Sequence, residues 1–370
     1  MILGVPKEIK NNEFRVGLTP QSIKALVKNN HEIIVESNAG IGSGFSDDDY
    51  VGAGAKILKD PKDIFEISEL IIKVKEPQLS ETQLLKPDQI LFTYLHLASS
   101  KQLTEQLLES KCISVAYETI TSDSHGLPLL TPMSEIAGRL SIQAGAKCLE
   151  KHSGGSGILL GGSSYSPPAN TLVIGGGVVG SNAALIADGM KSNLTILEKN
   201  PERIEFLINE FPKAKILNID DIEIENIISD YDLIIGAVLI PGTQAPQVIQ
   251  KKHLQLMKHS CVIVDVAIDQ GGCFETSKAT THEDPTYVID NVIHYCVANM
   301  PGAVPRTSTI SLNTATLPYI LQLANMGIKA FCQTSHHHLN GLSTYKGKLT
   351  YKPVADLFEF PYSSPSDIFD

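Results

Sequence analysis

Three polar side chains stand beside apolar runs of this sequence, and their types are suited to binding and protonating a small acid. Arg15 lies in the segment KEIKNNEFRVGLTP, Lys75 follows the apolar run 70–74, and His96 follows the run 90–94. Two cations can hold a carboxylate, and a histidine exchanges protons near neutral pH. Each residue also has a plainer interpretation, as part of a surface ion pair, a solvated strand end or a loop histidine.

A fourth polar group, Asp269, follows another apolar run in the sequence VDVAIDQGG. A carboxylate in an apolar, glycine-rich setting is a candidate acid–base group or electrostatic stabiliser, and the alternative is an aspartate that caps a turn. The three adjacent histidines 336–338 are expected in a solvated loop, because neighbouring side chains cannot all point the same way. We therefore expect no metal site.

The segment TLVIGGGVVG, residues 171–180, has the pattern of a strand, a tight turn and a helix that together bind a dinucleotide. Gly175 permits the turn, Gly177 lets the backbone approach a pyrophosphate, and Gly180 allows the helix to pack closely on the strand. The phosphates are expected at the helix N-terminus, where unpaired N–H groups and the helix dipole favour negative charge. The alternative is a glycine-rich turn without a ligand.

An acidic residue, Glu198, stands at the end of the next apolar run. An acid at this position accepts a hydrogen bond from the ribose 2′-hydroxyl and repels a 2′-phosphate, which favours NAD over NADP. Lys199 and Arg203 lie nearby and weaken this preference. We expect NAD as the cofactor.

Alternating apolar runs and helical patterns must position these residues. Helices are expected from Pro20, with Thr19 as N-cap, over Met133–Lys151, over Ser181–Met190 and from Thr307 onward. The end of the chain, after Lys352, is expected to be irregular. The expected strands are Ile2–Val5, Glu32–Glu36, Leu70–Val74, Ile90–Tyr94, Ile113–Ala116, Thr171–Ile174, Leu194–Leu197, Lys215–Leu217, Leu233–Gly236 and Val262–Val266.

These elements predict an α/β fold with two Rossmann-like domains and largely parallel sheets. The segment 131–300 carries a complete nucleotide-type α/β series, so we expect it to be an NAD-binding domain inserted into a discontinuous substrate domain. That second domain is expected to combine 1–130 with 301–370. Chains of this design place the active site in the cleft between the domains.

Composition and charge exclude several classes of function. The 370 residues include 41 acidic and 30 basic ones, for a net charge of −11, and contain no run of Lys or Arg, so we expect no nucleic-acid partner. Two uncharged stretches, 152–187 and 307–328, are interrupted by polar residues and are expected to be buried rather than to span a membrane. The N-terminus lacks a signal-peptide pattern and the six cysteines form no regular framework, which favours a cytoplasmic protein.

Several long motifs also resemble one known family, the NAD-dependent L-alanine dehydrogenases. The motifs are GVPKEIKNNEFRVGLTP, IIKVKEP, LFTYLHLA, TPMSEIAGRLS, IGGGVVGSNAA, GAVLIPG, VDVAIDQGGCFE, YCVANMPGAVPRTST and GLSTYKG. The resemblance covers essentially the whole chain up to Tyr351. Members of that family oxidise L-alanine by hydride transfer to NAD and release pyruvate and ammonium, and they assemble as hexamers.

The resemblance implies a role for each candidate residue. Arg15 and Lys75 would bind the carboxylate and carbonyl of the substrate, His96 would be the proton donor and acceptor, and Asp269 would be the second acid–base residue. The residues that would line the cofactor site are Ser134, Gly175, Gly177, Val178, Val179, Gly180, Glu198, Arg203, Val238, Leu239, Val266, Ala267, Ile268, Asp269, Lys278, Val297, Ala298, Asn299 and Met300.

Three other functions compete with this interpretation. The nucleotide-binding subunit of a proton-pumping transhydrogenase shares the fold and the fingerprint, but it needs no amino-acid site, and Arg15, Lys75 and His96 argue against it. A saccharopine-type dehydrogenase would need room for a larger substrate. An NAD-binding regulatory protein without turnover would not need both His96 and Asp269.

Overall fold

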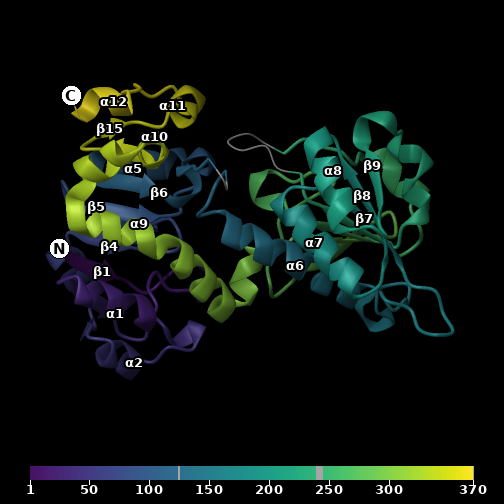
Figure 1. Cartoon of the computed structure of the whole chain (residues 1–370), viewed down its shortest axis with the longest axis horizontal. Coiled ribbons are helices and arrows are strands. Elements are labelled where there is room, and N and C mark those ends of the chain that lie inside the picture. The colour runs from purple at the N-terminus through teal and green to yellow at the C-terminus, as the bar shows by residue number, and fades with distance from the viewer. Residues whose placement is uncertain (124–125, 239–244, 370) are drawn as a thin grey trace. The chain divides into compact units, whose positions relative to one another are not determined.

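The computed structural model describes residues 1–123, 126–238 and 245–369, and Leu239, one of the predicted cofactor residues, lies outside them. The chain divides into two compact units (Figure 1). Unit 1 combines Met1–Met133 with Val304–Asp370, and unit 2 is Ser134–Ala303. The sequence-based boundaries stand at 130/131 and 300/301.

Unit 1 is built on a sheet whose central strands are parallel. The strand order is β15-β14-β6-β5-β4-β1-β2-β3, and only β14 and β15 pair antiparallel. Consequently β1, β4 and β5 are neighbours, and their carboxyl ends lie at one edge. The strands are β1 (Ile2–Val5), β2 (Glu32–Glu36), β3 (Lys56–Leu58), β4 (Leu70–Ile72), β5 (Ile90–Thr93), β6 (Ile113–Ala116), β14 (Leu342–Tyr345) and β15 (Lys348–Leu349).

Helices cover this sheet, and their starts follow local sequence rules. The α1 helix begins at Pro20, and Thr19 caps it as predicted, with its side-chain oxygen accepting from the N–H of Ser22. The helices of unit 1 are α1 (Pro20–Lys28), α2 (Asp47–Gly52), α3 (Pro61–Ile67), α4 (Leu79–Thr82), α5 (Lys101–Ser110), α9 (Pro305–Thr334), α10 (His336–Leu339), α11 (Lys352–Phe358) and α12 (Pro365–Phe369).

The long helix α9 explains the uncharged stretch 307–328. Its buried polar residues Thr309 and Asn313 bond to the loop that follows Arg15 rather than to solvent. The Oγ1 of Thr309 accepts from the N–H of Val16, and the Oδ1 of Asn313 accepts from the N–H of Thr19 at 2.8 Å. No described helix is long and apolar enough to cross a membrane.

Unit 2 has the strand order of a dinucleotide-binding fold. Its sheet runs β12-β13-β11-β10-β7-β8-β9, in which six strands are parallel and β12 joins β13 antiparallel. In chain order the parallel strands are arranged 3-2-1-4-5-6, the Rossmann order. The elements are α6 (Thr131–Cys148), β7 (Asn170–Ile174), α7 (Val178–Gly189), β8 (Asn193–Glu198), α8 (Pro201–Glu210), β9 (Lys215–Asn218), β10 (Leu233–Gly236), β11 (Val262–Asp265), β12 (Thr286–Ile289) and β13 (Val292–Tyr295).

Hydrophobic side chains fill both faces of this second sheet. Val173, Ile196 and Ile235 belong to the cluster on one face, and Leu172, Ile234 and Ile263 belong to the cluster on the other. Strands buried on both faces read as continuous apolar runs, which is the reason that the sequence pattern located them.

Three expectations about local structure are wrong. The chain after Lys352 is not irregular, because it forms α11 and α12. The histidines 336–338 lie in the short helix α10 rather than in a loop, and the ring of His337 bonds Thr121 and Asp123. The strand expected to reach Val74 ends at Ile72, because the N–H of Val74 bonds a glutamate side chain instead of a neighbouring strand.

Candidate active site

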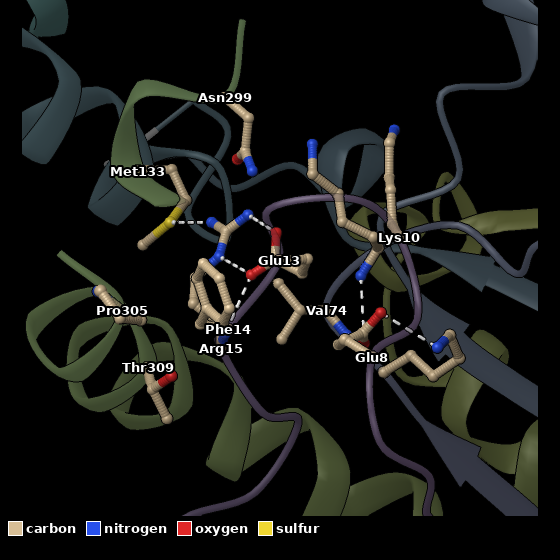
Figure 2. Close-up of polar contacts among 12 residues, drawn as sticks. Glu8, Lys10, Glu13, Phe14, Arg15, Val74, Met133, Asn299, Pro305 and Thr309 are labelled. Atoms are coloured by element: carbon tan, nitrogen blue, oxygen red, sulfur yellow. Dashed lines mark hydrogen bonds and ion pairs between the residues drawn. The ribbon is translucent and has the colours of Figure 1, made fainter. Parts of the chain in front are cut away.

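Arg15 lies in the loop between β1 and α1 and is held by Glu13 (Figure 2). Its Nε donates to Glu13 Oε1 at 2.7 Å, its Nη2 donates to Oε2 at 2.5 Å, and its Nη1 contacts Met133 Sδ at 3.1 Å. Only 2% of Arg15 is exposed. Burial alone would raise the pKa of Glu13, but the hydrogen bonds and charge of Arg15 outweigh it and lower that pKa to about 2. The guanidinium is therefore fixed in one orientation.

Lys75 follows β4, and its main chain is fixed on both sides. Its N–H lies 3.4 Å from Oε1 of Glu8, and its carbonyl oxygen accepts from the hydroxyl of Thr93 at 2.9 Å. The residue is 8% exposed. Lys75 follows β4, which stands between β1 and β5 in the sheet. The strand β1 precedes Arg15, and β5 precedes His96.

His96 follows β5 in a left-handed backbone conformation, with φ 48° and ψ 39°. Few residues other than glycine adopt it, and an observed case at a strand end is a hint of function. Glu118 stabilises this conformation, because its carboxylate accepts from the N–H of Leu95 at 3.0 Å and from that of His96 at 2.7 Å. The imidazole stacks on Tyr94 with ring centroids 5.8 Å apart.

Electrostatic coupling links these residues. The charge of Lys75, besides that of Arg15, helps to lower the pKa of Glu13. Burial alone would raise the pKa of Glu76, but the bond and charge of Lys10 and the charges of His96 and Lys75 lower it. The three residues singled out in the sequence therefore share one neighbourhood at the carboxyl edge of the unit 1 sheet, where α/β folds bind ligands.

In unit 2 the glycine fingerprint adopts the geometry that its pattern predicts. Gly175 has φ +96°, and a Cβ there would stand 2.8 Å from the carbonyl oxygen of Ala237. A Cβ at Gly180 would stand 1.7 Å from the carbonyl oxygen of Gly175, so only glycine lets the helix approach the strand this closely. A Cβ at Gly177 would meet nothing within 4 Å. Gly177 thus borders open space at the start of α7.

Glu198 and Arg203 both bind the backbone of this turn. The Oε2 of Glu198 accepts from the N–H of Gly176 at 2.7 Å, and its Oε1 accepts from the N–H groups of Lys199 and Asn200. The Nε of Arg203 donates to the carbonyl oxygen of Gly176 at 2.6 Å. A carboxylate has about four lone-pair positions, so three N–H donors leave Glu198 able to accept one more.

Asp269 lies in the short 3-10 helix Ile268–Gln270 after β11, and its side chain is exposed. Its Oδ2 accepts from the N–H of Asn299 at 3.4 Å. The buried carboxylate of this segment is instead Asp265, which is 0% exposed. The expectation of an apolar setting for Asp269 is therefore wrong, because Asp269 is exposed.

Asp265 holds that loop by accepting several hydrogen bonds. Its Oδ1 accepts from the N–H of Ala267 at 3.0 Å, and its Oδ2 accepts from the N–H of Cys273 at 2.9 Å and from the hydroxyl of Ser277 at 2.5 Å. Burial raises the pKa of Asp265, although these bonds lower it in part. The loop from 266 to 277 is thus organised around one buried carboxylate.

The other predicted cofactor residues follow neighbouring strands of the unit 2 sheet or begin its helices. Val178 and Val179 form the first turn of α7, and Ser134 lies in the first turns of α6. A Cβ at Gly138 of α6 would stand 2.2 Å from the carbonyl oxygen of Val179, so these two helices pack closely. The predicted cofactor residues that follow β10, β11 and β13 are Val238, Val266, Ala267, Ile268, Lys278, Val297, Ala298, Asn299 and Met300.

Four acidic residues that hold the loops were not predicted from the sequence. Glu8, Glu13, Glu118 and Asp265 each accept hydrogen bonds from a segment that carries a predicted site residue. A signal was present for one of them: a lysine inside the apolar run IIKV requires a buried acidic partner. The partner's identity was not predictable from the run itself.

Comparisons with known proteins identify the family of the chain. The family model described as alanine dehydrogenase/PNT, N-terminal domain, matches residues 4–137, and the one described as alanine dehydrogenase/PNT, C-terminal domain, matches residues 141–352. The chain belongs to this alanine dehydrogenase/PNT family. No described group of three or more His, Cys, Asp or Glu residues is arranged to hold a metal ion.

Several similar proteins within the family are alanine dehydrogenases. A curated alanine dehydrogenase from Staphylococcus epidermidis is 51% identical over 369 residues, which is 99% of each chain. Those from Halomonas elongata and Methanococcus maripaludis are also 51% identical over 98% of this chain. A solved L-alanine dehydrogenase is 48% identical, with a TM-score of 0.93 over 97% of this chain and 99% of its own.

A transhydrogenase from Sinorhizobium meliloti is similar at a lower level. It is 20% identical, with a TM-score of 0.80 over 95% of this chain and 99% of its own. At that identity the similarity shows the fold alone. The predicted two-part α/β fold with largely parallel sheets is confirmed, and the comparisons favour the alanine dehydrogenases over the transhydrogenase subunit.

Proposed function

We propose that this chain is an NAD-dependent L-alanine dehydrogenase, which catalyses the reversible oxidative deamination of L-alanine to pyruvate and ammonium. The observation that carries the proposal is the grouping of Arg15, Lys75 and His96 after the adjacent strands β1, β4 and β5. A transhydrogenase nucleotide-binding subunit has no need for two cations and a histidine at that edge. The identity of about half of all residues with curated alanine dehydrogenases supports the same choice.

The chemistry assigns a role to each residue. Arg15 and Lys75 bind the carboxylate and the carbonyl oxygen of pyruvate, through charge-assisted hydrogen bonds. His96 accepts a proton during deamination and donates one during the reverse reaction, which suits a group that titrates near neutral pH. Asp269 is the second acid–base residue and part of the cofactor site.

The residues of unit 2 fit a dinucleotide. The N-terminus of α7 has no side-chain cap, and Gly177 at that position borders open space, so backbone N–H groups are available to a pyrophosphate. The further lining residues are those named from the sequence, of which Leu239 lies outside the described residues. When bound, NAD accepts the hydride from the substrate's α-carbon.

One assay tests the proposal directly. The purified chain should oxidise NADH when pyruvate and ammonium are both present, and omission of ammonium should abolish the reaction. Glyoxylate and 2-oxobutyrate, run beside pyruvate, test the substrate preference. NADH binding without turnover on any of the three acids would contradict the proposal and favour an NAD-binding protein without this activity.

Two variants test the assignment of the acid–base role. His96→Ala should lower turnover by about 10²–10⁴ and flatten the pH dependence, which should run in opposite directions for deamination and amination. NADH binding should persist, because the fingerprint lies in unit 2. If Asp269→Asn abolished turnover and the pH dependence while His96→Ala kept both, the role would belong to Asp269.

A homo-hexamer in the cytoplasm, without a nucleic-acid or membrane partner, belongs to the same proposal. The family resemblance carries the assembly state, and six buried cysteines that are all free thiols are compatible with a reducing compartment. Light scattering after size-exclusion chromatography should give six times the mass of one chain. A monomeric mass at micromolar concentration would contradict the hexamer.

A further inference from the structure

A buried cluster of three charged side chains, Lys73, Glu8 and Glu81, adjoins the main chain that leads to Lys75. Lys73 is 0% exposed, and its Nζ donates to Glu8 Oε2 at 3.0 Å and to Glu81 Oε1 at 2.7 Å. Glu8 is 6% exposed and Glu81 is 4% exposed. Burial alone would lower the pKa of Lys73, but the charges and hydrogen bonds of both glutamates raise it to about 12. The lysine therefore remains charged and keeps both carboxylates in place.

The two glutamates share Lys73 but differ in what else they bind. The second oxygen of Glu8 accepts from the N–H of Val74 at 2.6 Å and lies 3.4 Å from the N–H of Lys75 (Figure 2). The second oxygen of Glu81 accepts from the N–H of Gln78 at 2.7 Å, at the start of α4. Only Glu8 therefore connects the buried charge to the backbone of Lys75.

The bond from the N–H of Val74 to Glu8 takes the place of a hydrogen bond to a neighbouring strand, directly before Lys75. The β4 strand ends at Ile72, and beyond it the carbonyl oxygen of Val74 still accepts from the N–H of Tyr94, while the N–H of Val74 bonds Glu8. The carboxylate of Glu8 accepts from the N–H groups of Val74 and Lys75, and the hydroxyl of Thr93 donates to the carbonyl oxygen of Lys75 at 2.9 Å. With both sides of the residue fixed, the direction in which its side chain leaves the backbone is fixed too.

We propose that Glu8 is a positioning residue for Lys75, and that it sets the pyruvate affinity of this chain by fixing the main chain at Lys75. The inference rests on the proposed function, because it takes Lys75 as a ligand of the substrate. Glu8 needs no contact with substrate or cofactor for this role. An error of about 1 Å in the position of a substrate-binding group can cost up to about 100-fold in rate.

The chain offers a matched pair of variants. Glu8→Gln and Glu81→Gln each remove one of the two negatively charged partners of Lys73 and keep the volume of the side chain. A glutamine at position 8 replaces one carboxylate oxygen by an NH2 donor, which would face either the Nζ of Lys73 or the N–H of Val74 without accepting from it. We expect Glu8→Gln to raise the KM for pyruvate by about 10-fold, with the dissociation constant of NADH unchanged. Glu81→Gln should change that KM less than about 2-fold, because its other partner is Gln78.

A double-mutant cycle with Lys75→Ala separates positioning from general damage. If Glu8 acts through Lys75, Glu8→Gln should add less than about 2-fold to the loss that Lys75→Ala causes alone. If Glu8→Gln yields too little folded protein, Glu8→Asp is the alternative. It keeps a carboxylate as a partner for Lys73, but its shorter side chain reaches less far toward the N–H of Val74. Glu8→Asp should then raise the KM for pyruvate in the same way.

Three results would overturn this inference. They are an equal loss in Glu8→Gln and Glu81→Gln, an unchanged KM for pyruvate in a folded Glu8 variant, and full additivity in the double-mutant cycle. Failure of the proposed function looks different, because the wild-type chain would then show no NADH oxidation with pyruvate and ammonium. The wild-type assay therefore precedes the variants.

Discussion

The two units hold their site loops by the same means but balance the charge differently. In unit 1, Glu8 binds the N–H groups of Val74 and Lys75 and is paired with the buried Lys73. In unit 2, Asp265 binds the N–H groups of Ala267 and Cys273, and its described hydrogen-bond donors are all uncharged. Both carboxylates are almost completely buried.

The difference shows what such a carboxylate requires. A charge in a protein interior costs several kcal/mol unless it is paired or accepts several hydrogen bonds. Asp265 satisfies this requirement with backbone and hydroxyl donors from one short loop, whereas Glu8 uses Lys73, a single cation that it shares with Glu81. The cluster in unit 1 therefore depends on that one lysine, and the site in unit 2 depends on the geometry of one loop.

The largest effect is expected from Lys73→Met, which would leave Glu8 and Glu81 buried without a cation. Removing one partner of a buried ion pair destabilises a protein by about 3–5 kcal/mol. Urea unfolding followed by circular dichroism measures this loss. The control is Lys56→Met, because Lys56 pairs with Glu32 on the surface, where such pairs contribute about 0–1 kcal/mol. Equal losses in the two variants would contradict the comparison.

The second effect concerns pH and has opposite signs for two acids, Glu13 in unit 1 and Asp265 in unit 2. The pKa of Glu13 falls to about 2 from its ordinary 4.5, so its stabilisation is present above pH 4.5 and is lost as the pH falls toward 2. The pKa of Asp265 is raised, so its contribution is greatest in acid and is lost as the pH rises through the folded-state value. Unfolding free energies of Glu13→Gln and Asp265→Asn, measured between pH 3 and pH 7, check both directions.

The cost of Glu13→Gln should therefore be larger at neutral pH than in acid, by about 3 kcal/mol at most. The cost of Asp265→Asn should be larger in acid. If both costs changed in the same direction with pH, the opposite directions of the Glu13 and Asp265 pKa shifts would be wrong.

A smaller effect is expected from Asp265→Asn at neutral pH. An asparagine keeps one acceptor oxygen, so at least one N–H of the loop loses its partner, at a cost of about 1–3 kcal/mol. Asp269→Asn is the control, because that side chain is exposed and its substitution should change stability by about 0.5 kcal/mol or less. Unfolding at pH 7 measures both. A loss as large as that of Lys73→Met would show that Asp265 depends on a charge partner after all.

The smallest change is expected from Glu198→Ala, which tests the other loop of unit 2. Glu198 binds the N–H of Gly176 but lies near the surface, so its loss should cost about 1 kcal/mol or less. The preference for NADH over NADPH should narrow, because the acid that repels a 2′-phosphate is gone. Dissociation constants of both cofactors measure this ratio. An unchanged ratio would place the preference elsewhere.

Sequence reasoning located the long repetitive features and missed the isolated ones. Strands such as Leu233–Gly236 agree with their predicted bounds because an apolar run buried on both faces is visible in the sequence. The β3 strand has three residues and β15 has two, too few to show a period, and both were missed. The glycine turn was predictable because its residues are adjacent.

The candidate site was predictable only in its types of side chain. Lys75 and His96 stand out because each follows an apolar run, and Arg15 stands out in the loop after the first strand. Glu13 holds Arg15 from two residues away, but other contacts come from distant parts of the chain: Glu8 binds Val74, and Asn313 binds the loop after Arg15. No local pattern encodes such pairs.

The last strands of unit 1 have a consequence for how the chain is made. The β14 strand pairs with β6, and the hydroxyl of Ser114 bonds that of Thr344 at 2.7 Å. While a ribosome is still synthesising the chain, β6 remains an unprotected edge until about 230 further residues have emerged, and all of unit 2 is complete before then. Unit 2 is thus free to fold first, and the N-terminal part of unit 1 must wait, open to pairing with other nascent chains, for the C-terminal part of the same unit to arrive.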